Sequence, residues 1–493
     1  MGMDRLWVYI SLGIVLWIVK EIYKATTSSL ASIPGPLYTN YTRLPLKLSI
    51  ITGQRIYFVD ALHRRYGRVV RISPDEVSIS SLPEFKEIHR VGSPFLKSPW
   101  YDKFVNGEVP GVFNMRDPKQ HAARRKLFAR AFSKSELRGR WEGVVRSKVR
   151  LAVDRIKGEL DAENGTGRCD VLKWWTFLAT DVSGHLMFGE DFGMLELGVK
   201  NEYIHVLEST MMGSGINSEL PLIGFIGRHL PIASIRSMFR ANEYMTSYGR
   251  RAITNARTNS DSARNIFSGM IYESEKGEAS LTDVDVVTEA GNLIVAGSDT
   301  TAVTLTYLIW AVLDQPNLQQ ALEEEVGTLE DGCDDASLES LPLLNAVIKE
   351  TLRLYGAAPG SLPRSVPAGG ATLAGYFIPE GVTVSTQSWT VHRDESIYPN
   401  PDEFDVSRWL EEDGEGKGMR ASLPQSAFSP FGAGSRICLG IHLAEMELRL
   451  AAAQFFRECR GVRLAGDMTW ETMKPGNFFL IAPRGHRCDI VRK

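Results

Sequence analysis

The feature that most constrains this chain is a glycine-rich stretch that ends in a single cysteine, Cys438, directly before a helical pattern. Residues 430–440 read PFGAGSRICLG, and apolar residues recur at helical spacing over 441–450. Glycines let a backbone turn tightly and let a flat molecule approach it closely. A cysteine at the start of a helix has its thiolate favoured by the helix dipole and by free N–H groups, which suits a metal ligand.

One cysteine does not provide the four ligands of a structural zinc site, and no second Cys or His lies at zinc spacing. It suits an iron whose other ligands come from a porphyrin. Two plainer interpretations compete with this one. A lone cysteine is usually a small buried apolar residue, and a glycine loop before a helix also binds phosphate. The stretch matches neither of the two common phosphate-binding glycine patterns.

Composition narrows the class of protein. The chain has 493 residues, 43% of them hydrophobic, and a net charge of −3, which gives no indication of nucleic-acid binding. Its five cysteines are odd in number and show no paired spacing, which argues against a disulfide framework and for a reducing compartment. Nothing in the sequence marks an interior domain boundary.

The amino terminus carries an uncharged run, Leu6–Val19, followed by Lys20 and Lys24. Such a run is short for a membrane span of about 20 residues, but it approaches that length up to Tyr23 if Lys20 snorkels. A cleaved signal peptide is the alternative. The aromatic residues of the run suit a membrane interface, and the lysines favour a cytosolic body. We therefore predict an anchor over 1–24, a proline-containing hinge over 25–50 and a catalytic domain over 51–493.

Periodicity predicts a mainly α protein with minor β structure. A hairpin is expected over 67–80 and a strand-rich patch over 361–388, with loops at 329–338 and 411–420. Helices are expected over 118–132, 135–160, 170–188, 283–313, 316–328, 341–355 and 440–457.

The pattern Phe-x-x-Gly-x-Arg-x-Cys-x-Gly around Cys438 resembles the haem-binding signature of the cytochrome P-450 family, a membrane-anchored microsomal type in this case. It fixes five positions, and three further motifs follow the family's order along nearly the whole chain. The resemblance implies the P-450 fold and a haem b whose axial ligand is the Cys438 thiolate. Phe431, Arg436 and Gly440 would belong to the cofactor-binding loop.

A second motif, Val295–Thr301 (VAGSDTT), falls in the middle of the long predicted helix 283–313. Gly297 leaves room for something to lie against the backbone. The plain alternative is a threonine that bonds back to a helix carbonyl. The motif resembles the family's oxygen-activating sequence, which implies that Thr300 would hold the iron-bound dioxygen and that Asp299 would help to relay protons.

Glu350 and Arg353 share one helix face. Together with Arg408, in a stretch that resembles the family's Pro-x-x-Phe-x-Pro-x-Arg, they would form a buried network that locks the loop before the haem. This chain has Val406 where that pattern has proline.

The resemblance also implies cations for the two haem propionates. Arg436, Arg364 and Arg125 are the candidates, with His121 in the position where the family often has tryptophan. The basic helix around them carries Arg124, Lys126, Arg130, Arg138 and Arg140, and we expect it to face an acidic reductase.

The expected function is a haem-thiolate monooxygenase that inserts one oxygen atom from dioxygen into a lipophilic substrate. Electrons would come from an NADPH-cytochrome P-450 reductase, with cytochrome b5 as a second donor, at the endoplasmic reticulum membrane. The motif contexts resemble fungal members that tailor terpenoids, polyketides or alkaloids. An isomerase or dehydratase that uses no dioxygen, or a non-catalytic haem-binding protein, are the alternatives. The stretches expected around the substrate are 100–113, 207–230, 294–301, 357–362 and 478–479.

Overall fold

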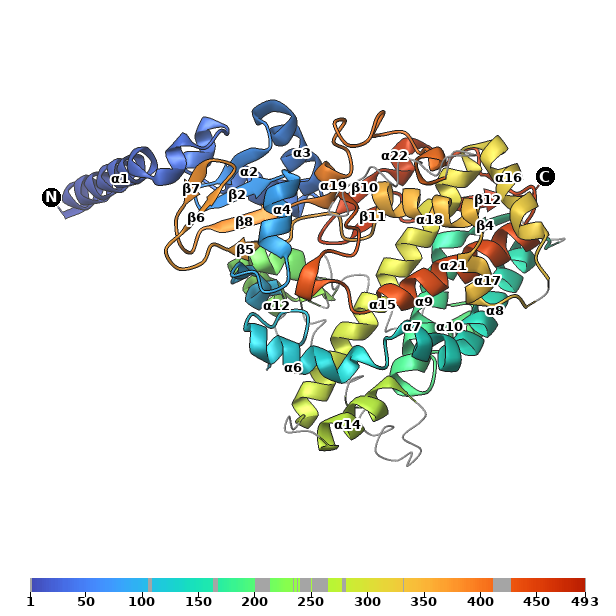
Figure 1. Cartoon of the computed structure of the whole chain (residues 1–493). Coiled ribbons are helices and arrows are strands. Elements are labelled where there is room, and N and C mark those ends of the chain that lie inside the picture. Colours follow the sequence, from blue (N-terminus) through green and yellow to red (C-terminus); the bar gives the residue numbers. More distant parts are fainter. Residues whose placement is uncertain are drawn as a thin grey trace.

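A computed structural model shows a helical body with a smaller β region on its amino-terminal side (Figure 1). It describes residues 2–492 except 105–108, 163–166, 200–212, 234, 237, 240–249, 251–264, 277–280, 331 and 411–426.

The centre of the body is the long helix α15 (Asp283–Leu313), whose carboxyl-terminal half is almost wholly buried. It packs against α9 (Val171–Phe188) and α21 (Ile441–Glu458). A capping box begins α15: Thr282 Oγ1 accepts from the Asp285 N–H, and the Asp285 carboxylate accepts from the Thr282 N–H. One large apolar core joins these helices, so α15 is a rigid wall for whatever lies beside it.

The main sheet has the strand order β1-β2-β8-β5-β3. Its strands are β1 (Val69–Ser73), β2 (Glu76–Ile79), β8 (Thr383–Thr386), β5 (Arg364–Ser365) and β3 (Leu96–Lys97). Strand β2 runs parallel to β8, and β3 pairs antiparallel with β5 so that Lys97 lies opposite Arg364. The sheet therefore brings two cations together from positions far apart in the sequence.

The remaining elements fill in around this frame. The 3₁₀ and π segments are η1 (Ser29–Ser32), η2 (Leu37–Asn40), η3 (Leu137–Trp141), η4 (Val406–Trp409) and η6 (Gly434–Arg436). The other strands are β4 (Arg168–Asp170), β6 (Ala371–Leu373), β7 (Tyr376–Ile378), β9 (Arg463–Leu464), β10 (Pro475–Asn477), β11 (Ile481–Pro483) and β12 (Asp489–Val491). The other helices are α1 (Gly2–Thr27), α2 (Leu44–Ile51), α3 (Arg55–Tyr66), α4 (Leu82–His89), α5 (Trp100–Phe104), α6 (Pro118–Ala129), α7 (Lys134–Glu136), α8 (Glu142–Leu160), α10 (Met194–Leu197), α12 (Pro221–His229), α14 (Ile266–Lys276), α16 (Pro316–Gly327), α17 (Asp335–Glu339), α18 (Pro342–Tyr355), α19 (Ser388–Val391) and α22 (Trp470–Met473).

Helix α1 projects from the body (Figure 1). The segment after it is packed against the sheet, because Leu30 and Ile33 belong to an apolar cluster with Val69 and Val77. In the described residues, one helix is long and apolar enough to cross a membrane, and it is α15, 72% buried in its most apolar window, as a core helix would be. The amino-terminal anchor therefore stays a prediction.

The predicted helices and the hairpin are confirmed, with shifts of a few residues at their ends. The helix expected over 135–160 consists of α7, a π-helical turn and α8. The loop expected over 329–338 is wrong in its second half, since Asp334 caps the short helix α17 by accepting from the Ser337 N–H. The loop expected at 411–420 lies outside the described residues.

Candidate active site

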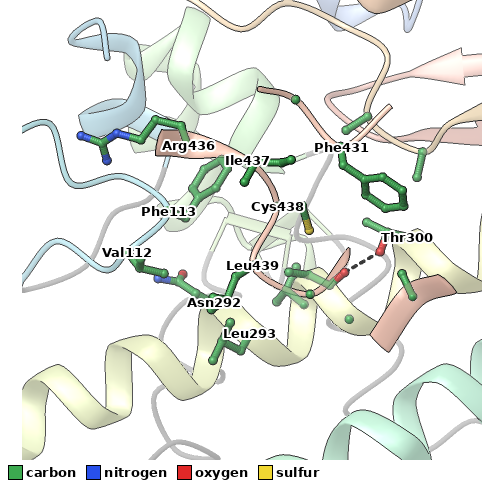
Figure 2. A pocket seen from close by; sticks show the side chains of 18 of the residues that line it. Val112, Phe113, Asn292, Leu293, Thr300, Phe431, Arg436, Ile437, Cys438 and Leu439 are labelled. Carbon is green, nitrogen blue, oxygen red and sulfur yellow. Dashed lines mark hydrogen bonds between the residues drawn. The ribbon is translucent and has the colours of Figure 1, made fainter. Parts of the chain in front are cut away.

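A cavity of about 450 Å³ lies between α15 and the glycine loop that carries Cys438 (Figure 2). It is also lined by residues of α5 and α6, by the segments at 357–364 and 479–480, and by α21. Of the five stretches expected around a substrate, 100–113, 294–301 and 357–362 each contribute several lining residues. The stretch 478–479 contributes Phe479, and the described part of 207–230 contributes Ser214.

The glycine loop holds Cys438 against this cavity. Gly434 has φ +62°, and a Cβ there would lie 1.8 Å from the His89 carbonyl oxygen, so only glycine fits beside α4. The Cys438 N–H donates to the Phe431 carbonyl oxygen at 2.9 Å, which closes the loop just before α21 begins. The Cys438 side chain is exposed, but the surface that it exposes belongs to the cavity.

Burial decides the protonation of this thiol in the protein alone. It raises the pKa of Cys438, and the Gly440 N–H and the Arg125 guanidinium offset it only in part. The N–H group at the helix start thus favours the thiolate, as expected, but it does not outweigh burial. A positive ion in the cavity would have to supply the rest, as bound metals do for coordinating thiols.

Cations gather along one side of the cavity: Lys97, Arg125, Arg364 and Arg436, with His121 beside them. Arg125 Nη1 donates to the Ile437 carbonyl oxygen at 2.8 Å, and Arg436 Nη1 donates to that of Met115 at 2.7 Å. Lys97 Nζ donates to the Phe113 carbonyl oxygen. Arg364 Nη1 is buried and has no hydrogen-bond partner in the described residues. These carbonyl partners fix the side chains but do not neutralise their charges.

Burial and neighbouring cations lower the pKa values of three basic side chains in this cluster, which itself contains no acidic side chain. Burial lowers the pKa of His121 to about 3, and Arg436 is the first of the neighbouring cations that lower it further. Burial and then Arg364 lower the pKa of Arg436 to about 10, and the same causes hold the pKa of Lys97 well below its usual value. Among the described residues that line the cavity, Glu447 is the one acid. The cluster therefore fits a group that carries carboxylates, as a haem does.

Sequence reasoning missed Lys97 in this cluster. It comes from β3, and it reaches the site through its pairing with β5, where Arg364 is its partner in register. No motif surrounds Lys97. The one feature that places it at the site is the register of two short strands, which a single sequence does not reveal. The Lys97 ammonium lies 4.3 Å from the centroid of the Tyr101 ring and 4.6 Å from that of Phe113.

Helix α15 forms the opposite wall and runs unbroken past the motif at 295–301. The Thr300 hydroxyl lines the cavity and donates to the Ala296 carbonyl oxygen at 2.7 Å, so the plain expectation of a back-bonded threonine also holds. Asp299 is not among the lining residues. A Cβ at Gly297 would lie 2.3 Å from Ser183 Oγ, so this glycine allows α9 to pack closely against α15. Gly297 also lines the cavity.

A carboxyl that the sequence did not single out also reaches the cavity. Glu447, on α21, is 1% exposed and hydrogen-bonds with the side chain of Thr301. Burial raises the pKa of Glu447 to about 8, and its Oε2 has no partner in the described residues. Burial thus favours the protonated form of this carboxyl.

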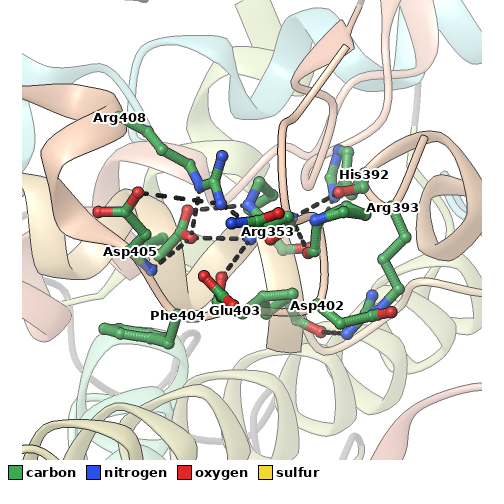
Figure 3. A network of polar contacts seen from close by, with 12 residues as sticks. Arg353, His392, Arg393, Asp402, Glu403, Phe404, Asp405 and Arg408 are labelled. Carbon is green, nitrogen blue, oxygen red and sulfur yellow. Dashed lines mark hydrogen bonds and ion pairs between the residues drawn. The ribbon is translucent and has the colours of Figure 1, made fainter. Parts of the chain in front are cut away.

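The predicted Glu-Arg-Arg group is brought together in a buried network (Figure 3). Arg353 donates through Nε and Nη2 to the two Glu350 carboxylate oxygens at 2.8 and 2.7 Å, and Arg408 Nε donates to Oε1 at 3.3 Å. Trp409 Nε1 and the Asp405 N–H also donate to this carboxylate, at 2.8 and 2.9 Å. The stretch around Val406 is thus held without the family's proline.

The network reaches the glycine loop through His392. Its Nε2 accepts from the Ser429 N–H at 3.0 Å, while its Nδ1 lies 2.9 Å from the Arg353 carbonyl oxygen. Burial lowers the pKa of His392 to about 3, so the ring is neutral with its proton on Nδ1. The arrangement makes His392 a link between Arg353 and the chain just before Phe431.

The basic helix is less available for docking than expected. Arg124 is mostly buried and pairs with Asp285 and Glu289, and Arg138 pairs with Asp335 and Glu339. Arg140 pairs with Glu136. Lys126, Arg130 and Arg140 stay exposed, whereas Arg124 is withdrawn from the surface proposed for an acidic partner.

Comparisons with known proteins agree with this geometry. The profile of the family described as Cytochrome P-450 matches residues 34–488. Cytochrome P-450 monooxygenase cypX of Dothistroma septosporum is 42% identical over 484 residues, covering 97% of this chain and 93% of that protein. Cytochrome P-450 monooxygenase stcB of Emericella nidulans is 43% identical over 480 residues, with coverages of 96% and 90%. Methylphloroacetophenone oxidase of Cladonia uncialis is 32% identical over 395 residues, with coverages of 78% and 86%.

The chain therefore belongs to the cytochrome P-450 family. It is a monooxygenase, an oxidoreductase whose cofactor is a haem with an axial cysteine thiolate, and the family's reaction needs a redox partner, dioxygen and a substrate. The names of these relatives, monooxygenases and an oxidase, speak against the isomerase, the dehydratase and the non-catalytic alternatives.

Proposed function

We propose that Cys438 is the axial ligand of a haem b held between α15 and the glycine loop. The observation that carries this assignment is that its side chain opens into the cavity that Thr300 and the four cations also line. Haem ligated in this way splits dioxygen and inserts one oxygen atom into a C–H or C=C bond, because the thiolate favours O–O cleavage. Phe431 and Gly440 line the same cavity beside Cys438.

The cation cluster would hold the two haem carboxylates. Lys97, Arg125, Arg364 and Arg436 supply the charge, and the partnerless Arg364 Nη1 gains an acceptor. The neutral His121 ring would donate one hydrogen bond, in the role that tryptophan has in many relatives. Glu350, Arg353 and Arg408 keep the preceding chain rigid and touch no reacting atom.

Thr300 would handle protons on the distal side. Its hydroxyl proton rests on the Ala296 carbonyl oxygen, which leaves the lone pairs of Oγ1 free to accept a hydrogen bond in the cavity. A turn about the C–O bond would let the same hydroxyl donate. We assign to Asp299 the supply of protons from outside the cavity.

The substrate would be lipophilic and aromatic. The Phe104 and Phe479 rings lie 4.7 Å apart, and Phe113 meets Phe479 edge to face at 5.7 Å. Phe479 holds φ +120°, a strained value for a residue with a side chain, so the fold forces its ring into this wall. The fungal relatives, one of them named for an aromatic ketone, support a role in tailoring terpenoids, polyketides or alkaloids in fungal secondary metabolism.

The protein would sit on the endoplasmic reticulum membrane with its catalytic domain (51–493) in the cytosol, anchored by residues 1–24 through the segment 25–50. Apolar residues that the structure leaves exposed support this arrangement. They lie on α1, at Leu12, Val15, Leu16, Val19 and Ile22, and on α12, at Leu222, Ile223, Phe225 and Ile226. An NADPH-cytochrome P-450 reductase would supply electrons, with cytochrome b5 as a second donor.

Two variants test the site directly. Replacing Cys438 by Ser should abolish the reduced carbon monoxide spectrum of thiolate-ligated haem, and persistence of that spectrum would refute the ligand assignment.

Replacing Thr300 by Val should raise peroxide release per NADPH consumed by about 10-fold or more, because the proton donor is lost. Thr306→Val is the matched control, since Thr306 makes the same kind of back-bond on α15 but does not line the cavity.

A further inference from the structure

One polar side chain in the wall of the cavity is left without its hydrogen bond. Asn292, on α15, lines the cavity, and its Nδ2 is buried with no partner in the part of the chain that the structure describes. Figure 2 shows the amide between Val112 and Leu293, both apolar. An amide buried without a partner is costly, so such a group calls for an explanation.

The surroundings of Asn292 are rigid and fitted to it. A Cβ at Gly111 would lie 2.3 Å from Asn292 Nδ2, so only glycine leaves room for the amide. The next residue is fixed to α15, because the Val112 N–H donates to Glu289 Oε1 at 2.8 Å. Arg124 Nη1 donates to the same oxygen at 2.8 Å, and Glu289 is wholly buried. The backbone beside the amide is thus held in place before any ligand arrives.

Asn292 is also at a useful distance from the chemistry. It precedes Thr300 by eight residues, which corresponds to about 12 Å along the helix. The aromatic wall of Phe104, Phe113 and Phe479 lines the same cavity. A flat aromatic molecule could therefore place one end near Cys438 and Thr300 and its other end near the amide.

We infer that Asn292 is a specificity-determining residue that donates a hydrogen bond from Nδ2 to an oxygen of the substrate, remote from the carbon that is oxidised. The terminal torsion of an Asn side chain is broad, so the amide can turn toward the cavity. The substrate class is then an aromatic compound that bears a carbonyl or similar acceptor oxygen. This inference rests on the proposed function, since it concerns the substrate of the same site.

The test uses two probes of nearly equal size, 2-acetylnaphthalene and 2-ethylnaphthalene, which differ in the ketone oxygen. Binding to the haem-loaded full chain is measured by calorimetry and by the shift of the haem spectrum. The wild-type protein should bind the ketone about 10-fold more tightly, as expected for one hydrogen bond in a buried site. Asn292→Leu, which lacks the donor, should lose this preference.

Thr288→Val is the matched control, because Thr288 lines the cavity one turn earlier on α15, and it should keep the preference. The melting temperature of Asn292→Leu should not fall, since no hydrogen bond is lost; a clear fall would assign Asn292 a structural role instead. The inference is overturned if the wild-type protein shows no preference for the ketone or if Asn292→Leu retains it. A wild-type protein without the thiolate carbon monoxide spectrum would instead refute the proposed function.

Discussion

At the scale of residues, the site is distinguished by buried cationic side chains that have no acidic partner among the described residues lining the cavity beside them. Lys97, Arg364 and Arg436 face one another across the cavity edge, and each lowers the pKa of a neighbour. Such a cluster is unfavourable in the empty protein and favourable once carboxylates arrive. If the cluster binds the haem as proposed, its residues would contribute to haem retention at the expense of the stability of the apoprotein.

Replacing Lys97 by Met should separate these two effects. The apoprotein should gain stability, because a buried and repelled ammonium is removed, whereas haem should leave the holoprotein about 10-fold faster, since a charged hydrogen bond is lost. Thermal unfolding of the apoprotein and haem transfer to an acceptor protein measure the two quantities. Equal haem release from the variant and the wild type would exclude Lys97 from haem binding.

Glu447 predicts a pH dependence. Its folded-state pKa of about 8 exceeds the ordinary value of 4.5, so the folded protein holds a proton that the unfolded chain releases. Its contribution to stability is complete below the ordinary pKa and is lost as the pH rises toward 8, by about 1.4 kcal/mol per pH unit. Glu447→Gln should abolish this loss, so its melting temperature relative to the wild type should rise over that range. Parallel pH curves would contradict the shift.

At the scale of elements, the loop that carries Cys438 depends on a network anchored in α18. Glu350 is wholly buried and accepts from Arg353, Arg408, Trp409 and the Asp405 N–H. His392 then connects Arg353 to Ser429, just before the loop. The position of the thiol is thus set by contacts between segments that lie far apart in the sequence.

Removing the carboxylate at Glu350 should therefore be severe. Glu350→Ala leaves two buried guanidiniums without their partner, which should cost about 3–5 kcal/mol and prevent recovery of folded holoprotein. Glu339→Ala is the control, because its pairs with Lys134 and Arg138 lie at the surface and should contribute at most about 1 kcal/mol. Comparable losses in the two variants, measured by denaturant unfolding and haem content, would contradict the structural role of the network.

The whole molecule consists of a body that encloses the cavity and a first helix that projects from it. On α1 the side chains of Leu12, Val15, Leu16, Val19 and Ile22 are exposed, whereas Leu30, shortly after its end, is buried against the sheet. We therefore expect membrane attachment and catalysis to depend on different parts of the chain.

Deleting residues 1–27 should free the protein from membranes and leave its haem site intact. Ser28 is kept because its side chain accepts from the Leu30 N–H and begins η1. Sedimentation with microsomal vesicles and the reduced carbon monoxide spectrum measure the two properties. A truncated protein that still sediments fully would place the main membrane contact elsewhere, with the exposed face of α12 as the first candidate.

The sequence by itself determined the helical class, the long helix at 283–313 and the loop of Cys438. These features rest on local rules: apolar periodicity, caps and the conformations that glycine permits. It also identified Glu350, Arg353 and Arg408, because fixed spacing within motifs carried them. The loop expected over 329–338 failed in its second half because a cap at Asp334 begins a helix too short to show periodicity.

The tertiary structure alone decided which distant side chains meet. The register of β3 against β5 brings Lys97 to Arg364, the packing of α21 on α15 brings Glu447 to Thr301, and Gly111 makes room for Asn292. It also removed Arg124 from the surface by pairing it with Asp285 and Glu289. The physical reason is that burial and charge pairing depend on neighbours in space, which local sequence patterns do not encode.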